Sequence, residues 1–237
     1  MSGHCRQAVE KYLELSRKDV SSLRKVATPC MDDHLLLPEE LVDKGELTHS
    51  VSRIVLKALY VARMSRLDIY WAVNSLAREV TRWTKACDRR LHKLVSYIHW
   101  TEFWVQTCCV GDAPEDCTLA IYADASFAGY LDDSKSSTGS VLCLVGPNTF
   151  VPITWICKKQ APVSHSSTEA EVIALCGSMA CLGYSSGKRL YRSLQKGSSL
   201  SPGPTKTSVA SSTPLSHSKA MYIEGVHKNH ILFQPKN

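Results

Sequence analysis

Residues 119–175 constrain the fold of this 237-residue chain more than any other part of it. Three segments alternate apolar with other side chains, a period of two that predicts β-strands. These segments are 119–127, 139–145 and 151–157. The first carries an acidic residue, Asp124, and a helical pattern over 166–182 follows the third. We therefore expect a mixed α/β domain with a three-stranded antiparallel sheet and one helix.

The start of this helix carries two glutamates with different expected roles. Ser166 to Glu169 reads S-S-T-E, which fits a capping box with Ser166 as N-cap and Glu169 reaching back to the cap amide. Glu171 has no such duty and is free to face Asp124. Carboxylate oxygens suit Mg²⁺, and a cluster of them can hold two ions around a phosphodiester.

Four motifs occur in order along this part of the chain, namely YADASFAGYLDD, KSSTGSV, KKQ and SSTEAE. Together they resemble the RNase H domain of copia-type LTR retrotransposon Pol polyproteins. The resemblance implies an RNase H-like fold that hydrolyses the RNA strand of RNA–DNA hybrids during reverse transcription, with two Mg²⁺ ions. It makes Asp124 and Glu171 the catalytic and metal-binding carboxylates. The ancestral partners would be the hybrid and the polymerase part of the same polyprotein.

The third carboxylate of that family, from a later strand written D-N-x-x-A, has no counterpart here. From Val172 to Asn237 the sequence contains no Asp, and Glu224 is its only Glu. Glu224 is a weak candidate for a metal ligand, because a Ser/Pro-rich segment precedes it. Activity is therefore expected to be impaired or absent. The alternative is a non-catalytic relic of the fold that acts as a weak nucleic-acid-binding or interaction protein.

Two further features are candidates for nucleic-acid contact. Trp155, Lys158 and Lys159 match the family's third strand, and an aromatic beside cations suits a sugar–phosphate backbone. A sheet-covering Trp with solvated lysines is the alternative. Residues 185–237 hold eight basic residues and one acidic residue, which suits phosphate contacts but equally suits a solvated tail.

The organisation of the whole chain follows from its composition. Residues 1–46 are expected to form an N-terminal helix over 5–25 and an irregular connection. Residues 47–116 predict three helices, and ALYVARMSRLDIYWAVNSLAREV resembles the family's link between polymerase and RNase H domain. The RNase H-like domain, truncated, then spans 117–184. The Ser/Pro-rich basic tail, 185–237, cannot bury enough apolar surface to fold and is expected to be largely disordered.

Other patterns receive structural interpretations. No apolar run approaches 18 residues and the N-terminus lacks a signal-peptide core, so we expect an intracellular protein, cytoplasmic or nuclear, without membrane contact. The ten cysteines lack C-x-x-C spacing and are expected to be reduced. The remaining polar candidates are expected to be turn or loop residues, namely Asp132, Asp133, His165, His227 and His230.

Overall fold

The computed structural model describes residues 2–129, 133–182, 208–211 and 233–235. The chain divides into two compact units, one made by residues 1–106 with 233–237 and the other by residues 107–232. We call them the helical unit and the sheet unit. Their elements are α1 Ser2–Ser16, η1 Val20–Ser22, η2 Asp33–Leu35, α2 Pro38–Val42, α3 Ser52–Met64, α4 Leu67–Arg78, η3 Val80–Arg82, α5 Lys85–Trp100, β1 Trp104–Gln106, η4 Pro114–Asp116, β2 Thr118–Ser126, β3 Ser137–Val145, β4 Phe150–Lys159, α6 Ser167–Ser178, β5 Ser208–Ser211 and β6 Phe233–Pro235.

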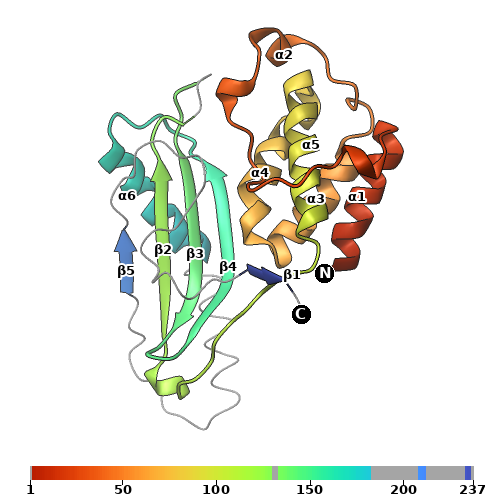
Figure 1. Ribbon diagram of the computed structural model, residues 1–237. Helices are drawn as coiled ribbons and strands as arrows, with labels where there is room; N and C mark the ends of the chain where they lie inside the picture. Colours follow the sequence, from red (N-terminus) through yellow and green to blue (C-terminus); the bar gives the residue numbers. More distant parts are fainter. Residues whose placement is uncertain (1, 130–132, 183–207, 212–232, 236–237) are drawn as a thin grey trace. The chain divides into compact units, whose positions relative to one another are not determined.

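The sheet unit confirms the predicted fold class. Strands β2, β3 and β4 form antiparallel pairs in the order β4-β3-β2, and α6 packs against β2 and β3 (Figure 1). The core between them contains Ile121, Leu142 and Leu182, with Leu119 and Ile156 partly buried beside it. The alternation of apolar residues therefore placed the three strands correctly.

One strand of this sheet was not predicted. Strand β5 pairs in parallel with β2, from Ala120 opposite Ser208 to Ala123 opposite Ser211. It makes β2 an inner strand of the four-stranded order β4-β3-β2-β5. It lies in the segment that composition marks as unfolded, most of which is outside the described residues, as is Glu224.

Strand β4 lies at the edge of the sheet, and this position explains how it accommodates a proline. Pro152 has no N–H for the ladder, and such residues are found on edge strands or at bulges. The β3–β4 register shifts between Leu142 and Cys143, and Pro152 pairs with Cys143 directly beyond the shift.

The helical unit contains the three predicted helices α3, α4 and α5, and differs from expectation before them. Helix α1 ends at Ser16 rather than near residue 25, because Arg17 takes a left-handed φ of 54°. The connection that follows includes a short helix, α2, with Pro38 in its first turn. Among the described residues, no helix is long and apolar enough to cross a bilayer.

A buried ion pair organises the centre of the helical unit. Arg66, only 2% exposed, donates to Asp68 at 2.7 Å and to the carbonyl and hydroxyl of Thr101 at 2.9 and 2.7 Å. The Tyr97 hydroxyl donates to the same carboxylate at 3.1 Å. Burial and the charge of Asp68 raise the pKa of Tyr97, so its hydroxyl remains a donor. This network joins the start of α4 to the end of α5.

We predict that Asp68→Ala destabilises the helical unit by roughly 3–5 kcal/mol, because it leaves the guanidinium of Arg66 buried without its counter-charge. Urea unfolding followed by helical circular dichroism measures the change. The matched control is Glu79→Ala, which breaks an exposed pair with Arg82 and should cost less than about 1 kcal/mol. Equal effects of the two substitutions would contradict the central role of the buried pair.

Candidate carboxylate site

Asp124 lies near the end of strand β2, one residue beyond the described pairing with β5. Antiparallel pairing with β3 continues through Asp124, which lies opposite Gly139. Parallel pairing with β5 stops one residue earlier, at Ala123. The described pairing with β5 therefore ends just before Asp124, which is half-buried.

The entry into α6 fixes one of the two glutamates. The Ser166 hydroxyl, at the N-cap, accepts a hydrogen bond from the Glu169 N–H at 3.1 Å. The Glu169 carboxylate accepts a 2.7 Å bond from the N–H of His165. The reciprocal bond thus goes to the residue before the N-cap, not to the cap amide as expected. Glu169 satisfies a donor at the helix entry, and the contribution of His165 is its backbone amide.

Glu171 instead meets the end of β2. Its carboxylate accepts a hydrogen bond from the backbone N–H of Ala125 and interacts electrostatically with Asp124. Burial raises the pKa of Glu171, the Ala125 bond opposes this, and the nearby Asp124 charge adds to the rise. The structure therefore brings Asp124 and Glu171 together and directs Glu169 to the helix entry.

A residue without a predicted role holds this arrangement in place. Gln160 is 5% exposed, and its side-chain amide donates to the Thr138 hydroxyl at 3.1 Å and to the Ala170 carbonyl at 2.9 Å. Its side-chain carbonyl accepts from Ser164 at 3.2 Å. The amide thereby connects β3, the end of β4 and the first turn of α6. The KKQ motif, whose third residue is Gln160, was the available sequence signal.

The other predicted polar residues lie in different surroundings. Lys159 pairs with Asp133 at 2.8 Å, and its hydrogen bond lowers the pKa of that carboxyl below the usual range. This pair joins the end of β4 to the β2–β3 turn. Trp155 is buried, at 8% exposure, whereas Lys158 is exposed. Assignment of Trp155, Lys158 and Lys159 to nucleic-acid contact stays a prediction.

The described residues do not fit a two-ion magnesium site. No group of three or more His, Cys, Asp or Glu side chains within 2–129, 133–182 and the short strands β5 and β6 could hold a metal ion. Two adjacent divalent cations repel strongly, and ligands without charge cannot compensate that repulsion. Among the residues with described positions, Asp124 and Glu171 form a pair of carboxylates.

An inner strand that carries Asp124, a covering helix that carries Glu171 and a parallel later strand are consistent with an RNase H-like α/β protein. The chain is similar to the retrovirus-related Pol polyprotein from transposon TNT 1-94 of Nicotiana tabacum, with 32% identity over 70% of this chain and 12% of the relative. It is also similar to the corresponding polyprotein from transposon RE1 of Arabidopsis thaliana, with 30% identity over 66% of this chain and 10% of the relative. It is therefore related to copia-type retrotransposon Pol polyproteins, which confirms the resemblance seen in its motifs.

An uncharacterised mitochondrial protein of Arabidopsis thaliana is 31% identical over 58% of this chain and 54% of its own length. The chain thus spans about a tenth of the polyproteins and about half of this smaller relative. No protein-family model and no solved structure matches the chain at a significant level.

We predict that Glu171→Gln stabilises the sheet unit at neutral pH. The pKa of Glu171 is higher in the folded state than in the unfolded state. The free energy of unfolding therefore falls as the pH rises from below the pKa of the unfolded state to above the pKa of the folded state. Glutamine keeps an acceptor for Ala125 but carries no charge. The gain should be less than about 1 kcal/mol for this partly exposed group and vanish below about pH 4.

Thermal unfolding between pH 3.5 and 8 tests this prediction. Glu169→Gln is the matched control, because it removes the same charge from the favourable first turn of α6 and should give no gain. A Glu171→Gln gain that persists unchanged at pH 3.5 would contradict the electrostatic explanation.

We also predict that Gln160→Ala destabilises the sheet unit by about 1–3 kcal/mol, because it removes a buried amide from three hydrogen bonds. The matched control is Gln7→Ala, which removes an exposed amide that accepts a hydrogen bond from Lys57. Amide hydrogen exchange of α6 should accelerate only in Gln160→Ala. Unchanged protection of α6 would show that Gln160 does not hold this helix.

Proposed function

We propose that this chain is a retrotransposon-derived RNase H-like domain that has lost most or all of its hydrolytic activity. Its ancestor would have cleaved the RNA strand of RNA–DNA hybrids during reverse transcription. The relatives' description as Pol polyproteins supports the descent. The second part of the proposal, the loss of hydrolytic activity, is supported by the composition of the carboxylate site.

The observation that carries this proposal is the composition of β5. In the enzymes that the motifs resemble, a strand later than the helix supplies the third carboxylate. Here the later strand beside β2 is β5, which reads Ser-Val-Ala-Ser and ends at Ser211, opposite Ala123 and next to Asp124 along the sheet. The absence of an acid from β5 therefore supports the proposal that the third carboxylate has been lost.

What remains at the site can bind and orient but has little means to activate water. Two carboxylates hold less negative charge than a metal pair requires. A substitute acid on a poorly positioned segment would be ineffective, since a displacement of about 1 Å can already cost on the order of a hundredfold in rate. Residual function would be contact with nucleic acid, favoured by the net charge of +6.

We predict that the purified chain does not hydrolyse a fluorescently labelled RNA–DNA hybrid in Mg²⁺ or Mn²⁺ above the background of Asp124→Asn. Gel analysis of the labelled RNA strand measures this. A second variant, Ser211→Asp, returns an acid to β5 beside Ala123 and should produce metal-dependent cleavage if one absent ligand is the cause. Ser208→Asp, at the opposite end of the same strand, is its control.

Metal-dependent cleavage by the unmodified chain that disappears in Asp124→Asn would refute the loss of activity and establish an enzyme. Absence of cleavage in Ser211→Asp as well would show that more than one ligand has been lost.

A further inference from the structure

The outer face of α3 combines basic, aromatic and aliphatic side chains. Six exposed side chains follow one another along it at helical spacing, three basic, one aromatic and two aliphatic. They are Arg53, Leu56, Lys57, Tyr60, Arg63 and Met64. We call them the α3 face. At 3.6 residues per turn they fall within an arc of about 120°.

The opposite side of the same helix anchors it in the core. Ile54, Val55, Ala58, Val61 and Ala62 are all at most 2% exposed. By contrast, Leu56, Tyr60 and Met64 are 61%, 49% and 56% exposed. The helix therefore presents three large apolar groups to solvent from a packed backbone, with basic side chains beside them.

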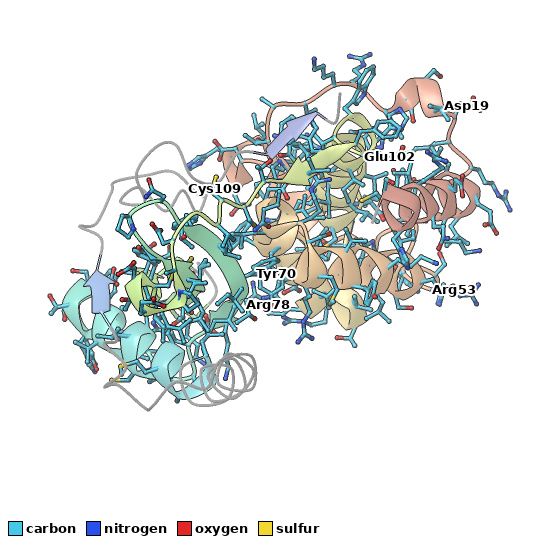
Figure 2. All side chains as sticks on the ribbon, turned by 90° about the horizontal axis from the view of Figure 1, so that it is seen from below. Asp19, Arg53, Tyr70, Arg78, Glu102 and Cys109 are labelled. Carbon is cyan, nitrogen blue, oxygen red and sulfur yellow. The ribbon has the colours of Figure 1, made fainter. Side chains whose placement is uncertain are left out.

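The charges on the α3 face lack acidic counterparts. Helix α3 contains no Asp or Glu. Several other cations of the helical unit are in ion pairs, including Arg6–Glu102, Lys85–Asp43, Arg89–Glu40 and Arg90–Asp33. Within the described part of the chain, Arg53, Lys57 and Arg63 form no ion pair, and Lys57 contacts the neutral Gln7 at 3.3 Å. Arg53 projects from the periphery of the unit in Figure 2.

Tyr60 lies between the cations and is itself held by a neighbouring ring. Its centroid is 5.4 Å from that of His4 on α1, with the rings tilted by 39°. Half of its surface nevertheless remains exposed. A restrained aromatic ring among cations is a suitable platform for a nucleobase, since bases stack on such rings while cations contact the phosphates.

We propose that the α3 face binds a nucleic-acid strand, with Arg53, Lys57 and Arg63 on consecutive phosphates and Tyr60 beneath a base. The three cations span about 15 Å along the helix axis. Charge complementarity favours a polyanion, and the ring and aliphatic groups between the cations favour one with flat apolar groups between its charges. This site goes beyond the proposed function, because it lies in the helical unit and needs neither Asp124 nor Glu171.

Fluorescence anisotropy with the full chain tests the proposal, using a labelled single-stranded DNA 12-mer and an RNA–DNA hybrid of the same sequence. The triple substitution Arg53→Gln, Lys57→Gln and Arg63→Gln removes the cations of the α3 face. The matched control substitutes Arg17, Lys18 and Arg24 with Gln; all three are exposed and form no ion pair among the described residues. Both triples change the net charge equally and keep the basic C-terminal segment.

Between 50 and 200 mM NaCl, loss of the α3 cations should reduce the slope of log affinity against log salt by about 2–3, as expected for three phosphate contacts. The control should change the slope by less than about 1. Tyr60→Ala should weaken binding at least about fivefold, and Tyr60→Phe should retain it, because stacking needs the ring and not the hydroxyl. The single substitution Arg53→Gln, on an exposed position, guards against misfolding of the triple.

Equal loss in the two triples would overturn the proposal and indicate general charge attraction. Absence of binding at 50 mM NaCl would overturn it as well. Competition by poly-glutamate as effective as that by DNA, with no effect of Tyr60→Ala, would assign the face to an acidic protein instead. None of these binding measurements depends on hydrolysis. The proposed loss of RNase H activity can therefore be right or wrong independently of them.

Discussion

The geometry of the carboxylate pair depends on one buried amide, that of Gln160. The buried residues of helix α6 are all small, namely Ala170, Ala174 and Ser178. Apolar contacts of such small groups contribute little free energy and do not fix the position of the helix on the sheet. The Gln160 side chain supplies that specificity, because its donors reach β3 and the first turn of α6 at once. Glu171 follows Ala170 directly. Its approach to Asp124 is therefore set by hydrogen bonds at the helix entry rather than by any interaction between the carboxylates, which repel.

The helical unit follows the same principle with a charged group in place of an amide. Arg66 and Asp68 belong to the segment R-L-D-I, in which the related family has Pro where this chain has Leu67. Helix α4 nevertheless begins at Leu67, since the bonds of Arg66 to Asp68 and Thr101 define its start. Two residues of the R-L-D-I motif, Arg66 and Asp68, thus have a structural role at the start of α4. Buried polar groups with every partner satisfied specify position more sharply than apolar contacts do.

Local patterns predicted the elements that local interactions determine. Strands β2 to β4 follow the alternation of their side chains, and the S-S-T-E sequence identified both the start of α6 and the glutamate occupied there. Strand β5 could not be predicted, because pairing of Ser208–Ser211 with β2 is a long-range contact in a Ser/Pro-rich segment. The end of α1 at Ser16 was not predicted, because the left-handed residue that follows it is Arg17 and not the glycine that usually marks such a position. Gln160 was missed because a buried amide resembles an exposed one in sequence.

The carboxylate pair is the part of the fold that stability does not explain. Glu171 is held beside another acid with a raised pKa, so the folded state is less stable for its presence at neutral pH. The Ala125 amide could be satisfied by a neutral acceptor, and Glu169 already serves the helix entry. Residues that break a local rule without structural benefit are expected at functional sites. The closeness of Asp124 and Glu171 therefore has no explanation in the stability of the fold, and under the proposed function it is a feature kept from the ancestral site.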